Sequence, residues 1–172
     1  MQEMSVAAVG LDAATSTPVV LLQEVAPRHR MLPVWVGVAE AEAIEIERQQ
    51  LRLPRPPAHH LIAEVIDFCG RRLEHVCVTA VRDGVVHAEL VIDRGLHVSA
   101  RVSDAVAVAL HVGAPIMATD TVLDEAALEG VRMVEASESA APGGPADGLP
   151  DERTAVAELR EFLDHATPDD FS

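Results

Sequence analysis

The sequence contains no lysine and no tyrosine, and aromatic residues make up only 2% of its 172 positions. All 13 basic residues are arginine. Any phosphate would therefore meet the forked donor set of a guanidinium group. With so few aromatic rings, the core must be filled by valine, alanine, leucine and isoleucine, and the length suits one domain.

Cysteine is also scarce. Cys69 and Cys77 lie eight positions apart, and neither their number nor their spacing favours a disulfide framework or a zinc site. No segment is apolar over the length that a membrane span needs, and the first residues lack the pattern of a secretory signal. We therefore expect a soluble protein of the reducing cytoplasm that makes no membrane contact.

Positive charge is in short supply, since the formal net charge is −15. Residues 134–172 hold ten acidic residues and two arginines, a formal charge of −8. The preceding 133 residues hold 18 acidic residues and 11 arginines, a formal charge of −7. An acidic body repels phosphate backbones at long range. A function on nucleic acid therefore requires a local arginine patch, a divalent metal ion, or both.

Hydrophobic periodicity predicts an α+β domain whose mixed or antiparallel sheet has helices packed on it. Strands are expected at residues 4–10, 18–25, 32–37, 73–82, 85–93, 96–100 and 114–119. Helices are expected at residues 39–51, 58–69, 103–112 and 120–130. The strand at 32–37 is apolar on both faces and is expected to be central. Asp83 and Gly84 predict a hairpin turn.

The folded domain is expected to cover residues 1–133, followed by an acidic flexible tail at 134–172. Residues 135–152 are rich in serine, alanine, proline, glycine and acid, a composition typical of a disordered linker. A short amphipathic helix is expected near 153–165. Its apolar face would carry Val156, Leu159, Phe162 and Leu163.

Four glutamates lie on the expected helix at 39–51. Glu40 falls in the first turn, where the helix dipole favours a carboxylate, so it is either a surface charge or a functional group. Glu42, Glu45 and Glu47 are interpreted as charges on the solvent-facing side. Glu40 and Glu47 lie two turns apart on one side and could share a divalent cation.

The sequence RPPAHH crowds Arg55, His59 and His60 at the start of the helix at 58–69. An arginine and the free amides of a helix start suit phosphate, and His59 could act as general acid or base. The alternative is a plain helix start with exposed histidines. Neighbouring helical residues diverge by about 100°, so His59 and His60 are not expected to form a paired metal site. Four further histidines are interpreted as structural: His75, His87, His97 and His111.

A third group lies in ARVSDA, residues 100–105, where Arg101 leaves a strand and Ser103 and Asp104 open a helix. In one reading the two residues cap the helix and Arg101 pairs with a nearby acid. In the other, Arg101 joins Arg55 in a phosphate-binding cleft, with Asp104 as an acid or metal ligand. We predict that Arg55, His59, Arg101 and Asp104 converge on one cleft, with Glu40 at its rim.

Four motifs in this order resemble the bifunctional nuclease domain family, once known only as a domain of unknown function: LPVWVGVAEAEAI, PRPPAHHLI, SARVSDAVAVAL and APIMA. The match covers roughly residues 1–130, and each motif alone is less specific than the four together. The tail ELREFLDHATPDDF is similar to the C-terminal tail of actinobacterial-type members.

The resemblance implies an α+β domain, a homo-oligomer with a dimer favoured, and nuclease activity on both DNA and RNA. The cofactor to be expected for metal-assisted hydrolysis is a divalent ion such as Mg²⁺ or Mn²⁺. Carried over by position, the catalytic residues are Glu40, His59 and Asp104, and the phosphate-binding residues are Arg55, Arg101 and Ser103. No metal ligands are assigned.

The sequence departs from the family pattern at three positions. His60 and Ser99 stand where aspartate is usual, and Val102 stands where proline is usual. If either aspartate binds a catalytic metal, the substitution weakens activity here, and His60 replaces it only in part because imidazole suits transition metals better than Mg²⁺. Two functional classes stay open. One is a metal-assisted phosphodiesterase, and the other is a non-catalytic regulatory module that binds an anion or a partner in the same arginine-lined cleft.

Overall fold

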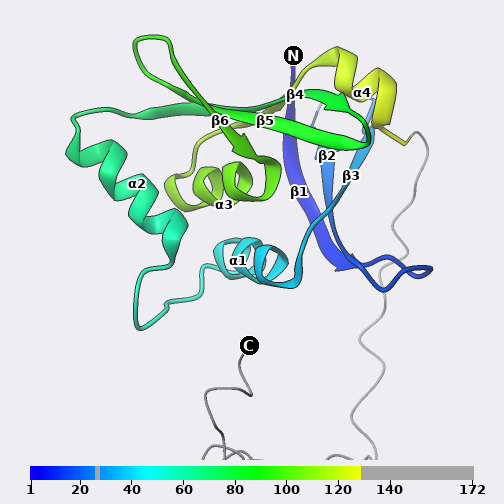
Figure 1. Cartoon of the computed structure of the whole chain (residues 1–172), viewed down its shortest axis with the longest axis horizontal. Helices are drawn as coiled ribbons and strands as arrows, with labels where there is room; N and C mark the ends of the chain where they lie inside the picture. The colour runs from blue at the N-terminus through cyan, green and yellow to red at the C-terminus, as the bar shows by residue number, and fades with distance from the viewer. Residues whose placement is uncertain (26–27, 129–172) are drawn as a thin grey trace, which may run out of the picture. The chain divides into compact units, whose positions relative to one another are not determined.

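The computed structural model describes residues 1–25 and 28–128. In these residues the chain forms an α+β domain with a seven-stranded mixed sheet and four helices, as the periodicity predicts (Figure 1). The strands are β1 (Gln2–Leu11), β2 (Pro18–Glu24), β3 (Met31–Trp35), β4 (Leu73–Arg82), β5 (Val85–Ile92), β6 (Leu96–Arg101) and β7 (Ile116–Ala118). The helices are α1 (Val38–Arg48), α2 (Ala58–Phe68), α3 (Val102–Val112) and α4 (Asp120–Ala126).

Two antiparallel meanders make up the sheet, whose order is β3-β2-β1-β7-β4-β5-β6. The first meander is β1 to β3 and the second is β4 to β6, with the predicted turn at Asp83 and Gly84 between β4 and β5. The short strand β7 joins them, because it pairs antiparallel with β1 and parallel with β4. The sheet is therefore mixed only at its centre.

The strand that the sequence predicts as central is β3, and this prediction is wrong because β3 lies at one edge of the sheet. Met31, Leu32 and Val34 are nevertheless buried, and α4 packs against the strand. The free edge is also partly covered, since the backbone N–H of Met31 donates to Leu128 at 3.0 Å and the N–H of Leu128 donates back at 2.7 Å. A strand that is apolar on both faces thus indicates that its side chains are buried, and does not indicate that a strand lies on each side of it.

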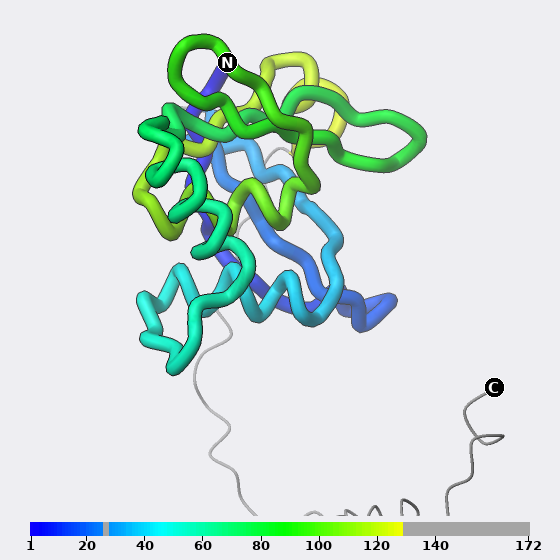
Figure 2. Tube along the Cα trace, turned by 60° about the vertical axis from the view of Figure 1, so that its left-hand side comes forward, coloured from blue at the N-terminus to red at the C-terminus, as the bar shows by residue number. Residues whose placement is uncertain are grey.

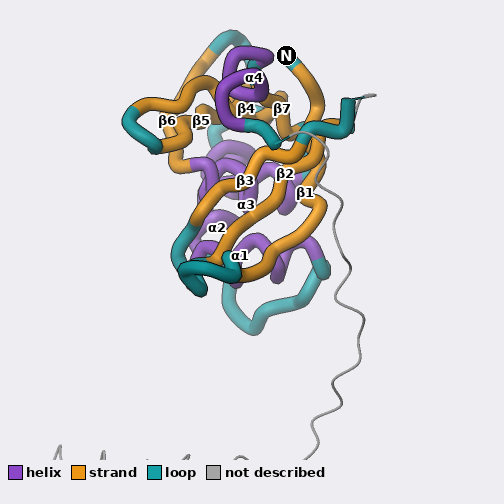
Figure 3. The backbone as a smooth tube through the Cα atoms, turned by 90° about the vertical axis from the view of Figure 1, so that its right-hand side faces the viewer, coloured by secondary structure: helices purple, strands orange, loops and turns teal. Residues whose placement is uncertain are grey.

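Helices α1, α2 and α3 gather on one side of the sheet, while α4 lies apart from them (Figures 1 and 3). Helix α3 is the central one, packing on β4 and β5 and against both α1 and α2 (Figure 2). Its alanines and valines are buried almost throughout. Small side chains on every face allow α3 to approach two helices and the sheet at once.

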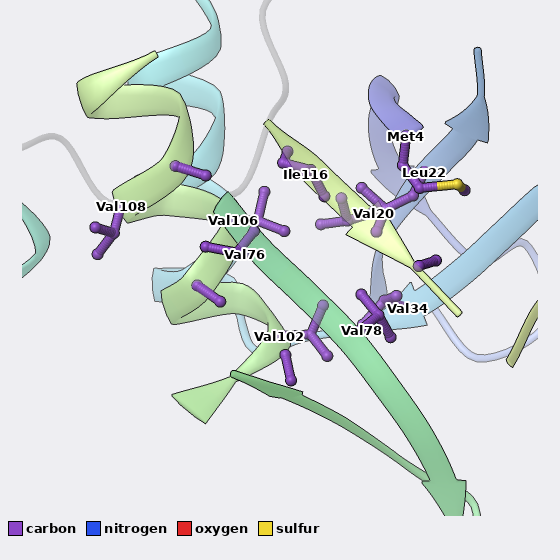
Figure 4. Close-up of a cluster of buried hydrophobic side chains, with 14 of the residues drawn as sticks. Met4, Val20, Leu22, Val34, Val76, Val78, Val102, Val106, Val108 and Ile116 are labelled. Carbon is purple, nitrogen blue, oxygen red and sulfur yellow. The ribbon is translucent and has the colours of Figure 1, made fainter. Parts of the chain in front are cut away.

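The core between α3 and the sheet is aliphatic, as the shortage of aromatic residues requires. Val102, Val106 and Val108 of α3 lie in the same buried cluster as Val76 and Val78 of β4 (Figure 4). No described helix is both long enough and apolar enough to cross a membrane. The predicted tail at 134–172 and its helix near 153–165 lie outside the described residues.

Candidate functional site

Helices α1 and α3 lie side by side and run in the same direction, because their starts and their ends make separate contacts. Glu40, in the first turn of α1, reaches Arg101 at the start of α3. Glu47, near the end of α1, reaches His111 in the last turn of α3. Seven helical residues rise by about 10.5 Å, so two polar clusters occupy opposite ends of this helix pair.

The first cluster, called the Arg101 cluster, consists of Glu40, Arg101 and Asp104. The Nε and Nη2 groups of Arg101 donate to the two oxygens of Asp104 at 2.7 and 2.9 Å, and Nη1 donates to Glu40 Oε1 at 2.8 Å. The Asp104 carboxylate first, and Glu40 after it, raise the pKa of Arg101 further above its ordinary value. Both carboxylates thereby fix the plane of the guanidinium group.

Arg101 still has donors to spare in this arrangement. A guanidinium group carries five N–H bonds, and the two carboxylates accept three of them. The side chain is 67% exposed, so the other two N–H bonds can meet a solute. The cluster as a whole carries one net negative charge, which makes it a weak attractor of anions unless a cation is added.

Gly37 makes room for this cluster. A Cβ atom at position 37 would lie 2.3 Å from Oε2 of Glu40. The backbone at Gly37 is extended, with φ of −76°, so it imposes no strain on a side chain. The glycine of the LPVWVG motif leaves room for the Glu40 carboxylate over the start of α1, and a side chain at position 37 would require that carboxylate to shift.

A groove of about 850 Å³ opens beside the Arg101 cluster. The junction of β3 and α1, the β4–β5 hairpin and the start of α3 supply its walls. Its polar lining residues are Glu40, His87, Ser99, Arg101 and Ser103, and Ser103 is itself buried. Most of the remaining lining is aliphatic, together with the exposed ring of Trp35.

Helix α3 begins differently from the sequence prediction. Neither Ser103 nor Asp104 caps it, because the residue at the cap position is Arg101, which makes no side-chain capping hydrogen bond. Asp104 lies in the first turn instead and uses both oxygens on Arg101. The prediction that Arg101 pairs with a nearby acid is confirmed, and the acid is both Asp104 and Glu40.

The second cluster, called the histidine cluster, joins α1, α2 and α3. It consists of Glu47, His59, His60 and His111. His59 Nε2 lies 2.8 Å from Glu47 Oε1, His60 Nε2 contacts the same oxygen, and His111 Nδ1 lies 3.1 Å from Oε2. Burial pushes the pKa of the Glu47 carboxyl upward, but hydrogen bonds from His60, His59 and His111 outweigh it and hold the pKa below its usual range.

One interpretation from the sequence is wrong in this cluster. Glu47 does not face solvent, since its side chain is only 9% exposed. His59 and His60 were not expected to form a paired metal site, yet their Nε2 atoms both reach Glu47 Oε1, because Glu47 approaches them from a neighbouring helix. His111, interpreted as structural, joins them, since its ring stacks on that of His60 with centroids 3.6 Å apart.

The predicted residues therefore do not converge on one cleft. Glu40, Arg101 and Asp104 come together, and Ser103 lines the same groove. His59 is about two helical turns away in the histidine cluster. Arg55 is exposed in the loop that follows α1, and no hydrogen bond or salt bridge between described residues joins it to either cluster.

One signal in the sequence could have revealed the second cluster. Glu40 and Glu47 lie at the start and near the end of α1, and Arg101 and His111 lie at the start and in the last turn of α3. Two parallel helices, one with acidic and the other with basic residues at both ends, can pair these residues at both ends. The direction of α3 relative to α1 depends on the sheet order, however, and no local pattern encodes it.

Comparison with known proteins gives consistent results. The family model described as the bifunctional nuclease domain matches residues 20–130. The uncharacterized protein Rv1829 of Mycobacterium tuberculosis strain H37Rv is 39% identical over 171 residues, covering 99% of this chain and 98% of that protein. The uncharacterized protein MT1877 of strain CDC 1551 / Oshkosh matches to the same extent.

Proposed function

The chain belongs to the bifunctional nuclease domain family, and from this membership we propose that it hydrolyses phosphodiester bonds of DNA and RNA. The observation that supports this proposal is the exposed guanidinium group of Arg101, held by two carboxylates at the wall of the groove. A fixed, planar cation with two unused N–H bonds is suited to bind two oxygens of one phosphate.

The carboxylates of the Arg101 cluster have two tasks in this proposal. They orient the guanidinium group, and they offer oxygen atoms to the divalent ion that hydrolysis requires in so acidic a protein. Mg²⁺ or Mn²⁺ suits carboxylate oxygen. Such an ion would supply a bound hydroxide and offset the negative charge of both the cluster and the phosphate.

The predicted roles of the individual residues follow from these positions. Glu40 and Asp104 are proposed to act beside the phosphate, and Arg101 and Ser103 to bind it. His59 would have to act from the histidine cluster, and Arg55 would have to reach the substrate from its loop. Both are therefore expected to matter less for hydrolysis than Arg101 does.

A second function is favoured by a specific feature of the groove. Its lining is largely aliphatic, and a site that only binds nucleic acid phosphates would be more polar and more basic. A non-catalytic regulatory module would use the same groove to hold a small anion or a partner protein, with Arg101 as its polar anchor.

A cleavage assay separates the two functions. Protein freed of host nucleases is incubated with fluorescent DNA and RNA oligonucleotides, with and without a chelator, as wild type, as Arg101→Ala and as Arg52→Ala. Arg52 is an exposed loop arginine outside both clusters and serves as the matched control. If the protein hydrolyses nucleic acid, the wild type should cleave the oligonucleotides. The chelator and Arg101→Ala should each abolish cleavage, and Arg52→Ala should cleave as the wild type does.

The other outcomes are equally informative. Binding of oligonucleotide or phosphate without cleavage, lost in Arg101→Ala, would support the regulatory module. Cleavage that Arg101→Ala leaves unchanged would contradict a role for the Arg101 cluster.

A further inference from the structure

The histidine cluster brings metal-ligating atoms from three helices to one point. Glu47 comes from α1, His59 and His60 from α2, and His111 from α3. One ligand atom each from Glu47, His59 and His60 lies within 4.8 Å of the others, and His111 Nδ1 contacts the second oxygen of Glu47 at 3.1 Å. Four donors from three helices are thus positioned by the fold, and not by a single flexible loop.

We propose that this cluster binds one divalent transition-metal ion of the zinc class. Imidazole nitrogen and carboxylate oxygen together are the donors that zinc and its neighbours prefer, whereas Mg²⁺ and Ca²⁺ prefer oxygen alone. Three histidines and one glutamate can complete a tetrahedral set. The single carboxylate offsets one of the two positive charges of the ion, and the acidic body attracts the ion from solution.

The distances within the cluster fit an ion after a small expansion. Ligand bonds of about 2.0–2.1 Å in a tetrahedral site place the donor atoms roughly 3.4 Å apart. Glu47 Oε1 and His59 Nε2 are 2.8 Å apart, and Glu47 Oε2 and His111 Nδ1 are 3.1 Å apart. An ion therefore requires the donors to separate by about half an ångström, and by more at His60, which contacts Glu47 Oε1 most closely. Small rotations of the Glu47 carboxylate and of the less buried rings of His60 and His111 can supply this separation.

Burial gives the site an inner wall and an outer entrance. The side chains of His59 and Glu47 are 8% and 9% exposed, so these two ligands are fixed in the interior. The side chains of His60 and His111 are 20% and 30% exposed. An ion can enter past these two rings.

The competing explanation is a hydrogen-bonded network without metal. Each of the three imidazole nitrogens could carry a proton and donate it to Glu47, which would satisfy the buried carboxylate. Such a network predicts no selective binding of zinc. An ion would replace those protons. The two explanations therefore differ in the selective binding of zinc, which can be measured directly.

An ion at this position would fasten α2 to the body of the domain. Helix α2 buries only His59 and Ala63, and it exposes Leu61, Val65 and Phe68. Two of the four ligands lie on α2, so ion binding would strengthen the attachment that α2 makes by packing on α3 and by the contacts of His59 and His60 with Glu47. This inference goes beyond the proposed hydrolysis, because the site lies at the end of α1 away from the Arg101 cluster and needs no substrate.

The test is a metal titration of the full-length, metal-stripped protein. Zn²⁺ binding is followed by calorimetry, and Co²⁺ binding by its visible absorption, whose intensity reports tetrahedral geometry. We expect one equivalent of ion per chain, a higher melting temperature with Zn²⁺, and no such effect of Mg²⁺. His60→Ala and Glu47→Gln are expected to weaken binding by about tenfold or more.

The matched control is His97→Ala. His97 pairs with Glu89 at 3.1 Å on the surface, so this variant removes a histidine–glutamate pair outside the cluster and is expected to bind zinc as the wild type does. His111→Ala provides a second loss of ligand at a more exposed position if Glu47→Gln fails to fold.

Failure to bind Zn²⁺ and Co²⁺ at micromolar concentration would overturn the assignment, as would equal binding by wild type, His60→Ala and His111→Ala. Nuclease activity does not enter this test. Loss of cleavage in Arg101→Ala with intact zinc binding would be compatible with the metal site. Loss of zinc binding in His60→Ala with intact cleavage would be compatible with hydrolysis in the groove.

Discussion

Single residues explain why the Arg101 cluster has its geometry, and Gly37 is the clearest example. A Cβ atom there would meet the Glu40 carboxylate at 2.3 Å, and alanine is also a poor residue at the cap position of a helix. Gly37→Ala is therefore expected to destabilise the domain by about 1 kcal/mol. The measurement is the urea dependence of unfolding.

Gly10 in β1 supplies the control for that substitution. A Cβ atom at Gly10 meets nothing within 4 Å, and this glycine does not have a positive φ. Gly10→Ala is expected to be neutral or to stabilise by about 0.4–1 kcal/mol, because alanine restricts the unfolded chain. Equal losses in both variants would show that Glu40 does not need the space at Gly37.

The ion pair of Glu24 and Arg30 gives a pH prediction at the same scale. Both residues are buried, and Arg30 donates to both oxygens of Glu24 at 3.0 Å and to Asp124 at 2.7 Å. The hydrogen bond from Arg30 outweighs burial and lowers the pKa of Glu24 below its usual value of 4.5. Because the pKa of Glu24 is lower in the folded than in the unfolded state, its ionised carboxylate stabilises the fold fully at pH values above the unfolded-state pKa. This stabilisation is lost as the pH falls through the folded-state pKa.

Wild-type stability is thus expected to fall as the pH drops below about 4.5, and Glu24→Gln should show a shallower fall. At neutral pH the same substitution should cost about 3 kcal/mol, since it leaves Arg30 buried with Asp124 at 2.7 Å and the more distant Asp120 at 3.9 Å as its acidic partners. Urea unfolding at a series of pH values measures both effects. An unchanged pH dependence in Glu24→Gln would contradict the assignment to this pair.

At the scale of elements, α3 is the helix around which the domain packs. Ala109 has no exposed surface, whereas Ala58 at the start of α2 is exposed. Ala109→Leu should overpack the contacts of α3 and cost about 1–3 kcal/mol, whereas Ala58→Leu should change stability by less than about 0.5 kcal/mol. Thermal unfolding of the two variants compares the packing of the two helices directly. Similar losses of stability would show that α3 is not packed more tightly than α2.

The elements also show how far sequence reasoning reaches. Periodicity and turn residues predicted the strands and helices closely, because apolar spacing and glycine stops such as Gly113 are local signals. The edge position of β3 and the burial of Glu47 were missed. Both depend on which elements become neighbours in space. The four glutamates of α1 give the pattern of a solvent-facing helix, and only the approach of α2 with His59 and His60 and of α3 with His111 buries Glu47.

The candidate site was predictable to the same degree. Glu40, Arg101 and Asp104 were brought together by one long-range contact and one contact within the first turn of α3. His59 and Arg55 were expected beside them because all are near helix starts. The structure shows that α1 separates those starts by its own length, which the motifs alone could not indicate.

At the scale of the whole molecule, the homo-oligomer inferred from the family stays a prediction, and α2 offers the surface that tests it. Leu61, Val65 and Phe68 follow a helical spacing on α2, and Phe68 is 92% exposed. A contiguous apolar stripe of this kind commonly marks an interface. We expect a second copy of the chain to cover it.

Light scattering after gel filtration should give a mass above 18.3 kDa for the wild type. The double substitution Leu61→Ser with Phe68→Ser is expected to shift the mass to that of one chain. Leu96→Ser, at an exposed leucine of β6, is the control and should not change the mass. A wild type that runs as a single chain at micromolar concentration would rule out the association.

Whether the Arg101 cluster binds the reacting phosphate is decided by the initial rate of oligonucleotide cleavage by wild type and Arg101→Ala at one fixed concentration of Mn²⁺. If the Arg101 cluster binds the reacting phosphate, the substitution should lower the rate by roughly a hundredfold or more, with little change in melting temperature because the ion pairs are exposed. Arg52→Ala should retain the wild-type rate. Equal rates in wild type and Arg101→Ala would show that the Arg101 cluster does not bind the reacting phosphate.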